Sequence, residues 1–378
     1  MGINPKGNRV VVAMSGGVDS SVAAALLKQQ GYDVIGITMQ VWPDVSEEEA
    51  YRSGGCCSLA AVEDARRVAG MLGIPHYVLN LKEIFEERVI ANFCHEYIIG
   101  RTPNPCLICN RDIKFGALLA RAMEIDASYV ATGHYARIAR SPDGRFLLLR
   151  GVDREKDQSY ALYMLTQDQL SRAMFPLGNM KKAEVRRMAR EIGLPVAEKA
   201  ESQEICFVTS GSYADFIRRR YPERFKPGPI IDCTTGRIVG IHRGLPEYTI
   251  GQRRGLRVEA GKPMYVIDID AKGNTVMVGP KEKTFSSGLI ASSVNFIPFE
   301  ELGEPMRVTC KVRYRAEEAG GIIERYTSSG RQKMVKLTFD EPQRAIAPGQ
   351  SAVFYDGEVV VGGGIIESRF TYPGRQRS

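Results

Sequence analysis

The sequence predicts an α/β chain that starts with a doubly wound parallel sheet, continues through a small central β-rich domain and ends in an antiparallel β-barrel. Two observations predict this fold class. Over the first half, short apolar runs alternate with longer helical patterns, which is typical of a parallel sheet with helices between its strands. From about Gly211 onward, turn pairs and short β-prone runs dominate, and this texture is typical of small antiparallel sheets and barrels.

The N-terminal half is expected to contain regularly alternating strands and helices. Gly31 and Gly73 are expected to end two of the helices, the second followed by Pro75, and Ser58 is a plausible N-cap. The expected strands cover residues 9–13, 33–39, 76–81 and 129–133, and the expected helices cover residues 20–30, 58–72, 83–99 and 115–124.

The clearest signal in the C-terminal half is a hairpin. Asp356-Gly357 lies between the β-prone runs 352–355 and 358–361, and Asp-Gly is a favoured two-residue hairpin turn. The last part of the chain is therefore expected to form a small antiparallel barrel or sandwich. The expected domains are 1–210 for the parallel sheet, 211–285 for the central β-rich part and 286–378 for the barrel.

Composition indicates an ordinary globular protein. The chain has 378 residues, of which 44% are hydrophobic and 25% charged, enough for two or three domains. No apolar run is long enough to cross a membrane, and the first residues lack the apolar core of a signal peptide. We expect a cytoplasmic protein with no membrane partner. A disulfide framework is not expected for its 8 cysteines.

The positive charge is concentrated in one window. Residues 181–262 hold 17 Lys and Arg against 10 Asp and Glu, a difference equal to the whole net charge of +7. The clusters are Lys181-Lys182, Arg186-Arg187, Arg218-Arg219-Arg220 and Arg253-Arg254. Any single cluster fits a solvated helix face equally well, but the set together favours a polyanionic partner such as RNA.

The segment Ser15-Gly16-Gly17-Val18-Asp19-Ser20 connects an expected strand to an expected helix. Glycines let backbone N–H groups approach phosphate oxygens, and the helix N-terminus adds partial positive charge. The loop lacks the Gly-Lys-Ser/Thr ending of a Walker A motif. With no lysine in the loop aimed at the terminal phosphates, it favours holding a leaving pyrophosphate, and hence AMP transfer to a substrate oxygen. Asp19 is a candidate ligand for Mg²⁺.

This loop resembles that of the PP-loop ATP pyrophosphatases, which have the adenine nucleotide α-hydrolase-like fold. Further segments occur in the order found in one family, the tRNA-specific 2-thiouridylases, and the resemblance covers nearly the whole chain. They are 13–20, 39–42 (Met-Gln-Val-Trp), 100–105 (Gly-Arg-Thr-Pro-Asn-Pro), 131–135 (Ala-Thr-Gly-His-Tyr), 156–160 (Lys-Asp-Gln-Ser-Tyr), 205–207 (Ile-Cys-Phe) and 348–355 (Pro-Gly-Gln-Ser-Ala-Val-Phe-Tyr).

The resemblance implies a set of binding residues. The residues that resemble the family's ATP contacts lie at or after the ends of expected strands. They are Ala13, Met14, Ser15, Gly16, Gly17, Val18, Asp19, Ser20, Met39 and Gly133. Residues that resemble its tRNA contacts are Asn104, Pro105 and Cys106 beside the target uridine, together with His134, Lys156, Asp157, Gln158, Arg313, Tyr314 and Gln350. Arg and Tyr offer phosphate pairing and a stacking surface for a splayed base.

Cysteines are the candidate sulfur carriers. Residues 102–110 are expected to form a proline-stiffened loop that leads into the helix around Phe115. Cys106 and Cys109 lie three residues apart near this expected helix start, where they can project to one side and where the helix N-terminus favours thiolate. By resemblance, Cys206 carries the persulfide, and Cys109 is the catalytic partner left in a disulfide.

Cys106 departs from the family's usual Asp at this position. The extra thiol allows a second route, in which Cys106, Cys109 and Cys206 hold a [4Fe–4S] cluster that delivers hydrosulfide. The sequence leaves the cluster and persulfide routes open. Zinc is not expected, because no second Cys-x-x-Cys or His-x-x-His pair completes a site. Cys56 and Cys57 are interpreted as local structure at a helix start, and Cys94, Cys233 and Cys310 as small buried residues.

The function expected from these features is ATP-dependent 2-thiolation of a tRNA wobble uridine. The uridine C2 oxygen is adenylated, pyrophosphate leaves, and sulfur displaces AMP. The sulfur donor is expected to be a cysteine desulfurase, a sulfur carrier or inorganic sulfide. One alternative is a PP-loop ligase that forms amides or guanidines on small metabolites, which would not need the cysteine set. Another is a non-catalytic RNA-binding protein, which would not need the intact loop.

Overall fold

The computed structural model describes residues 8–41, 59–200, 205–208, 211–258, 261–326 and 333–371. The chain divides into two compact units, each assembled from separate stretches of sequence. Unit 1 comprises residues 1–90, 105–210 and 358–360, and unit 2 comprises residues 91–104, 211–357 and 361–378. Each unit is described on its own.

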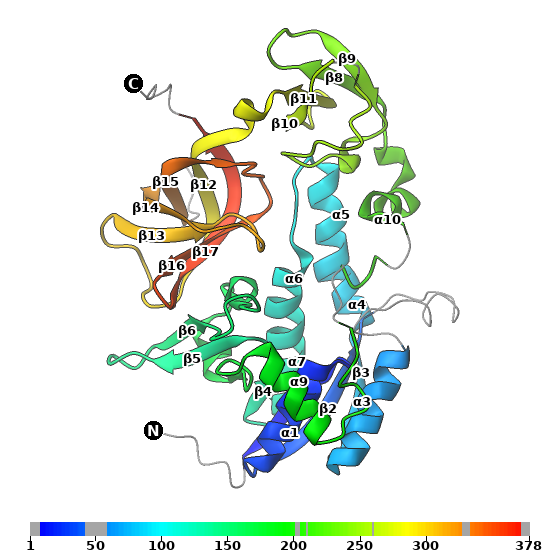
Figure 1. Ribbon diagram of the computed structural model, residues 1–378, viewed down its shortest axis with the longest axis vertical. Coiled ribbons are helices and arrows are strands. Elements are labelled where there is room, and N and C mark those ends of the chain that lie inside the picture. Colours follow the sequence, from blue (N-terminus) through cyan, green and yellow to red (C-terminus); the bar gives the residue numbers. More distant parts are fainter. Residues whose placement is uncertain are drawn as a thin grey trace. The chain divides into compact units, whose positions relative to one another are not determined.

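A parallel sheet with the strand order β3-β2-β1-β4-β7 forms the centre of unit 1 (Figure 1). All of its neighbouring strands pair in parallel. The chain builds outward from β1 in one direction through β2 and β3, and then in the other through β4 and β7. The doubly wound sheet predicted from sequence is therefore confirmed. The strands are β1 (Arg9–Ala13), β2 (Asp33–Gln40), β3 (His76–Asn80), β4 (Tyr129–Ala131) and β7 (Ala173–Met174).

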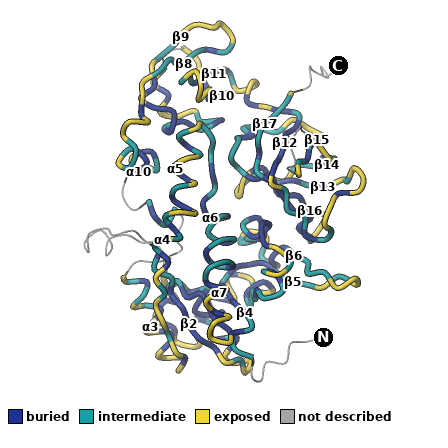
Figure 2. Tube along the Cα trace, turned by 180° about the vertical axis from the view of Figure 1, so that it is seen from behind, coloured by how far each residue is buried: buried dark blue, intermediate teal, exposed yellow. Residues whose placement is uncertain are grey.

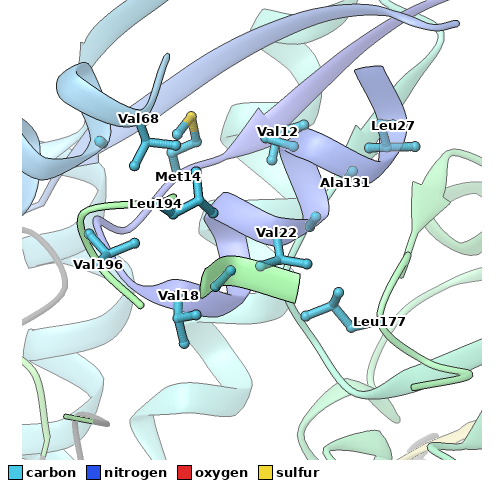
Figure 3. Close-up of a cluster of buried hydrophobic side chains, with 14 of the residues drawn as sticks. Val12, Met14, Val18, Val22, Leu27, Val68, Ala131, Leu177, Leu194 and Val196 are labelled. Atoms are coloured by element: carbon cyan, nitrogen blue, oxygen red, sulfur yellow. The ribbon is translucent and has the colours of Figure 1, made fainter. Parts of the chain in front are cut away.

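One apolar core joins this sheet to the helices on one of its faces. Alternate β1 residues Val10 and Val12 face α1 (Val18–Gln29), α3 (Leu59–Leu72) and α9 (Lys182–Glu191). Figure 3 shows Val22, Val68 and Leu194 from three separate segments around Val12. This core fixes the start of α1 against the end of β1, so the loop between them has rigid supports on both sides.

The helical run after β3 differs from the single helix expected over residues 83–99. It begins as α4 (Lys82–Phe85), continues as a π-helical segment (Glu86–Ile90) and becomes α5 (Ala91–Ile98), which belongs to unit 2. The described part of the chain also contains the short helix α8 (Gln167–Ser171) and α10 (Tyr213–Arg220).

The helix expected from Phe115 starts ten residues earlier. It comprises α6 (Pro105–Ile108), a π-helical segment (Cys109–Ala117) and α7 (Leu118–Glu124). The loop predicted around Cys106 is therefore wrong. Pro105 stands at the first helical position, where its fixed φ favours a helix and its missing N–H costs no hydrogen bond.

A hairpin that was not predicted follows β4. β5 (Ala136–Arg140) and β6 (Phe146–Arg150) pair antiparallel through a turn in which Gly144 has a φ of 90°. Val359, which comes much later in the sequence, pairs antiparallel with Leu149 of β6 within unit 1.

Unit 2 contains a small mixed sheet, in which β11 and β8 pair in parallel, and an antiparallel barrel, which confirms the central β-rich part and the C-terminal barrel. The smaller sheet has the order β10-β11-β8-β9, and the barrel has the order β12-β15-β14-β13-β16-β17, closed by pairing of β12 with β17. The strands are β8 (Gly228–Asp232), β9 (Ile238–His242), β10 (Tyr265–Asp270), β11 (Thr275–Gly279), β12 (Phe285–Phe296), β13 (Met306–Lys311), β14 (Ala319–Tyr326), β15 (Met334–Arg344), β16 (Ser351–Asp356) and β17 (Val359–Phe370).

The predicted hairpin is confirmed, but its turn lies one residue later than predicted, at Gly357-Glu358, because β16 extends to Asp356. β16 and β17 are neighbours in the barrel, and Gly357 has the positive φ of 52° that such a turn needs. Figure 2 shows buried stretches in β2 of unit 1 and in β16 of the barrel, whereas β14 and the edge strand β3 are mostly intermediate or exposed. Among the residues that the structure describes, no helix is both long and apolar enough to cross a membrane.

Candidate active site

Three neighbouring strands end at one edge of the unit 1 sheet, and predicted site residues follow each of them. The loop Met14–Gly17 follows β1, Met39 lies near the end of β2, and Gly133 follows β4. Since β1 lies between β2 and β4, and the chain reverses its winding direction there, this edge is the topological switch point. Doubly wound sheets bind nucleotides at this place.

Internal hydrogen bonds hold the loop in shape. Gly16 adopts a positive φ of 65°, where a side chain would also collide with the Ala61 backbone. The Ser20 hydroxyl accepts a bond from the Ser15 N–H at 3.1 Å and donates to the Gly17 carbonyl at 3.2 Å. The Ser21 hydroxyl donates to the same carbonyl at 2.8 Å. The turn is therefore preorganised, which lowers the entropy cost of binding an anion.

Gly133 packs directly against the first turn of α1. A Cβ at this position would lie 2.7 Å from the Asp19 carbonyl carbon and 2.8 Å from the Ser20 nitrogen. Only glycine allows β4 and α1 to approach this closely. Its location next to the loop agrees with an ATP contact, and its packing gives a second, structural reason for the residue.

The carboxylate of Asp19 forms a salt bridge with a buried lysine. Lys182 Nζ lies 2.8 and 2.7 Å from the two Asp19 oxygens, and the Tyr135 hydroxyl donates to one of them at 2.8 Å. Lys182 is only 8% exposed. The sequence interpretation placed this lysine in an RNA-binding cluster and saw no lysine at the loop, and the structure corrects both points.

A second lysine also reaches the loop. Lys199 Nζ donates to the Gly16 carbonyl at 3.0 Å and pairs with Asp64 at 2.7 Å. Since the carbonyl and the next N–H of a trans peptide point in opposite directions, this bond orients the Gly17 N–H away from Lys199. Sequence reasoning missed both lysines because they arrive from more than 160 residues away.

Cys106 and Cys109 lie in the first turns of the α6 helical run. Cys106 is exposed and Cys109 is half-buried, and neither forms a disulfide. The next residue, Asn110, is buried and donates its side-chain amide to the Ala161 carbonyl at 2.9 Å. Asn110 therefore fixes the orientation of the turn that carries Cys109.

The π-helical segment that begins at Cys109 has a dedicated support. Gln169 of α8 donates from its amide to the carbonyls of Arg111 at 3.0 Å and Phe115 at 2.8 Å. A π-helical turn is wider than an α-helical turn and needs tertiary contacts to persist, and such turns are frequent at functional sites.

Cys206 lies in a tight turn, Ile205–Val208, which is closed by a bond from the Val208 N–H to the Ile205 carbonyl at 2.9 Å. Phe207 anchors the turn by packing edge-on against Phe85 of α4, with ring centroids 5.8 Å apart. Helix α4 also contacts the π-helical segment that starts at Cys109. The two cysteine-bearing segments therefore share α4 as a support, while Cys206 is half-buried and forms no disulfide.

The described residues do not support the cluster alternative. Among them, no group of three His, Cys, Asp or Glu side chains is arranged to hold a metal ion, although Cys106, Cys109 and Cys206 are all described. The donor set for a [4Fe–4S] cluster is thus not assembled in this arrangement.

The other cysteines agree with the sequence analysis in part. Cys94 and Cys310 are buried as expected, and burial raises the pKa of the Cys310 thiol. Cys233 is half-buried rather than buried. Cys56 and Cys57, like Trp42 and Ser58, lie outside the described residues.

The predicted tRNA contacts of unit 1 mostly have partners within the chain. His134 is 8% exposed and hydrogen-bonded to the Thr132 hydroxyl at 2.7 Å, and burial, followed by the charge of Lys114, lowers its pKa. Asp157 is buried and accepts bonds from Ser159. Gln158 accepts from the Tyr135 N–H at 3.0 Å, and Lys156 is half-buried. Their contact with tRNA stays a prediction.

In unit 2, Gln350 supports the segment that leads to Asn104. Its amide donates to the carbonyls of Thr102 at 2.9 Å and Pro103 at 3.3 Å, and the Thr102 N–H donates to Pro348. Arg313 and Tyr314 are exposed, as a binding surface requires. Contacts of these residues with tRNA also stay predictions.

The basic window is not one uniform surface. Its residues fall in both units, and several of its cations are already engaged. Arg186 donates to the Ala197 carbonyl, and Arg218 pairs with Glu247 and stacks over Phe225. Arg253 and Arg254 are exposed beside a turn that the Gln252 side chain organises.

Comparisons with known proteins support this description along the whole chain. Three family models match in succession: a tRNA methyl transferase HUP domain over residues 8–210, a tRNA methyl transferase PRC-barrel domain over 214–280, and an aminomethyltransferase beta-barrel domain over 286–366. A solved 4-thiouridine synthetase bound to RNA and ATP covers 58% of this chain and 51% of its own at 18% identity, with a TM-score of 0.37, too low to carry an argument.

Curated relatives are far more similar. The tRNA-specific 2-thiouridylase MnmA 2 of Caldanaerobacter subterraneus subsp. tengcongensis is 56% identical over 365 residues, which cover 96% of this chain and 99% of the relative. The tRNA-specific 2-thiouridylase MnmA of Halothermothrix orenii is 54% identical over 363 residues, covering 96% and 100%. With this identity over nearly full length, and with the loop and cysteine segments described above, the chain belongs to the tRNA-specific 2-thiouridylase family.

Proposed function

We propose that this protein is an ATP-dependent sulfurtransferase that converts a tRNA wobble uridine to 2-thiouridine, releasing AMP and pyrophosphate. The main support for the proposal is that two features occur together within unit 1. A preorganised anion loop lies at the switch point of the sheet, and the segments bearing Cys109 and Cys206 both pack on α4. The names of the curated relatives support the same activity.

Activation of the uridine is the first chemical step. The C2 oxygen attacks the α-phosphorus of ATP, the bond to the β-phosphate oxygen breaks, and pyrophosphate leaves. The loop's N–H groups and the N-terminus of α1 bind the departing phosphates. Activation is required because a carbonyl oxygen is a poor leaving group, whereas AMP is a good one, so the barrier to its displacement is lower.

Sulfur transfer then uses the thiols of Cys109 and Cys206. The terminal sulfur of a Cys206 persulfide forms a bond to C2, and the C–O bond to AMP breaks. Cys109 thiolate attacks the Cys206 sulfur, so the S–S bond of the persulfide breaks and its electrons become the C2 thiocarbonyl. The protein is left with a Cys109–Cys206 disulfide, which a thiol reductant must open before the next turnover.

Asp19 is the residue that fits a divalent cation. Its carboxylate belongs to the first turn after the loop and its side chain is 32% exposed, so it combines a hard oxygen ligand with access to the nucleotide phosphates. Bound Mg²⁺ would neutralise charge on those phosphates. No step is assigned to an iron–sulfur cluster, because its three thiols are not assembled among the described residues.

The partners follow from the reaction. The tRNA must present an unstacked uridine, and Asn104, Pro105 and Cys106 are the proposed contacts beside it. The sulfur donor is proposed to be a cysteine desulfurase or a sulfur carrier, because Cys206 has to be loaded with zero-valent sulfur. We propose a cytoplasmic location, where tRNA and reducing thiols are both present.

The test is nucleoside analysis by mass spectrometry after incubation with tRNA, ATP, Mg²⁺ and a desulfurase with cysteine. Wild-type protein is expected to form 2-thiouridine. Cys206→Ser and Cys109→Ser are expected to lower its formation by roughly 10³-fold or more, because each removes a reacting sulfur. Both variants should still release pyrophosphate in the presence of tRNA, since adenylation does not use the thiols.

Cys233→Ser is the matched control, because it removes a half-buried thiol from unit 2. It should keep wild-type thiolation. If the wild type never forms 2-thiouridine, the proposed function is wrong. Iron measured in the same preparation tests the cluster route, and thiolation that requires bound iron would replace the persulfide mechanism.

A further inference from the structure

The nucleotide loop has no cation of its own. Residues 13–20 contain no Lys or Arg, and Asp19 adds a negative charge where the phosphates of ATP have to bind. Backbone N–H groups and a helix N-terminus supply only partial charges. A pyrophosphate leaving group develops negative charge as it departs, so a full positive charge close to the loop would stabilise the transition state for adenylation.

Lys182 supplies a positive charge at this place. It is the first residue of α9, and its backbone N–H donates to Asp153 at 2.8 Å, which fixes the start of the helix. Its ammonium lies on both oxygens of Asp19 and 5.8 Å from the centroid of the Tyr135 ring. Only 10% of the lysine side chain is exposed, against 32% of the aspartate.

This asymmetry distinguishes the pair from a surface salt bridge. The ammonium is almost withdrawn from water, so it depends on a nearby anion for its solvation. The aspartate faces the place where phosphates bind and can turn towards a metal ion. An incoming phosphate oxygen can therefore replace the carboxylate as the partner of the ammonium without leaving a buried charge unpaired.

We propose that Lys182 is the pyrophosphate-binding cation of the site, and that Asp19 holds it in place until ATP and its metal ion arrive. In the nucleotide complex the ammonium moves from the Asp19 carboxylate to an oxygen of the β- or γ-phosphate, and the released carboxylate faces the metal. No covalent bond changes in this exchange. The inference rests on the proposed function only in taking ATP as the substrate.

The first test compares nucleotide affinities without tRNA. Lys182→Met should weaken binding of ATP·Mg²⁺ by about 10- to 100-fold, as expected for loss of one charge-assisted contact. AMP lacks the β- and γ-phosphates, so its affinity should stay within about twofold of wild type. The control Arg190→Met removes a charge from the same helix, where Arg190 pairs with Glu198, and should change neither affinity.

Unchanged ATP affinity in Lys182→Met overturns the inference. Equal loss of ATP and AMP affinity also overturns it, because the lysine would then support the fold of the site rather than the terminal phosphates. Lys182→Arg keeps the charge and should retain part of the difference between ATP and AMP.

The second test uses the competing carboxylate and inorganic pyrophosphate as the probe. In metal-free buffer, Asp19→Asn should bind pyrophosphate more tightly than wild type by several-fold, because Lys182 no longer has an anionic partner to give up. Added Mg²⁺ should improve binding less in this variant than in wild type. Weaker metal-free binding by Asp19→Asn would show that no exchange takes place.

These outcomes separate the two proposals. If the affinities change as expected but 2-thiouridine never forms, the inference stands and the proposed function fails. If 2-thiouridine forms and Lys182→Met binds ATP like wild type, the inference alone fails.

Discussion

Single residues at this site combine packing with chemistry. Gly133 was expected from its sequence context to contact ATP, and the structure shows that it also allows β4 and α1 to touch. The sequence could reveal Gly133 because the Thr-Gly-His-Tyr segment that identifies it is continuous in the chain. The Asp19–Lys182 pair could not be predicted in this way, because its two members are 163 residues apart and meet only through the packing of α9 on α1.

Replacement of Gly133 by alanine tests this packing. The added Cβ would meet backbone atoms of Asp19 and Ser20 that cannot move independently of α1. We expect Gly133→Ala to lower the free energy of unfolding by about 1–3 kcal/mol and to weaken ATP binding. Denaturant unfolding and nucleotide titration measure the two effects.

Gly70→Ala is the control for this substitution. Gly70 lies within α3 and has open space around it, so alanine should stabilise the helix by about 0.5–1 kcal/mol. Equal stability of Gly133→Ala and wild type would mean that β4 and α1 are not in close contact.

At the scale of elements, sequence periodicity predicted which strands and helices exist more reliably than it predicted where they begin and end. Pro105 was interpreted as part of a loop, although it begins a helix, because proline is equally common in both settings. The β5–β6 hairpin was missed, although Ser141-Pro142-Asp143-Gly144 carries a strong turn signal between apolar runs. The π-helical character of Cys109–Ala117 depends on Gln169, which no local pattern reveals.

Removal of the Gln169 amide tests whether it maintains the π-helical segment. Gln169→Met leaves the Arg111 and Phe115 carbonyls without this donor, which should cost about 1–3 kcal/mol of unfolding free energy. Thiolation should fall while ATP affinity without tRNA is kept, because the change acts on the turn after Cys109. Asp168→Ala, a neighbouring change at an exposed side chain, should alter stability by no more than about 0.5 kcal/mol. Wild-type thiolation in Gln169→Met would exclude this role.

At the scale of the whole molecule, the sequence correctly predicted a parallel sheet, a central β-rich part and a barrel. The proposed division at residues 210 and 285 stays a prediction. The two compact units are assembled from discontinuous stretches, because tertiary pairing, which a linear reading does not contain, brings distant segments together. Net charge likewise located a basic window but could not reveal that Lys182 and Lys199 serve the nucleotide loop.

The salt dependence of tRNA binding tests the remaining basic residues. We expect affinity to fall at least about tenfold from roughly 50 to 200 mM salt, because each phosphate contact releases counterions. Arg253→Ala and Arg254→Ala should each reduce the slope of log affinity against log salt by up to about 1. The control Arg307→Ala removes an exposed arginine that is already paired with Asp340 and should leave the slope unchanged. A flat salt dependence of the wild type would argue against an electrostatic RNA-binding surface.

The assignment of residues 358–360 to unit 1 has a consequence for protein synthesis. Arg137 and Arg154 pair with Glu358, the Arg150 N–H donates to its carbonyl, and Val359 pairs with Leu149. A ribosome makes the β5–β6 hairpin some two hundred residues before it makes these partners. The edge strand β6 of the nascent hairpin therefore lacks its pairing partner while the intervening residues are translated. This edge of the hairpin is thus completed only after residues 358–360 have been translated, long after the strands of the parallel sheet.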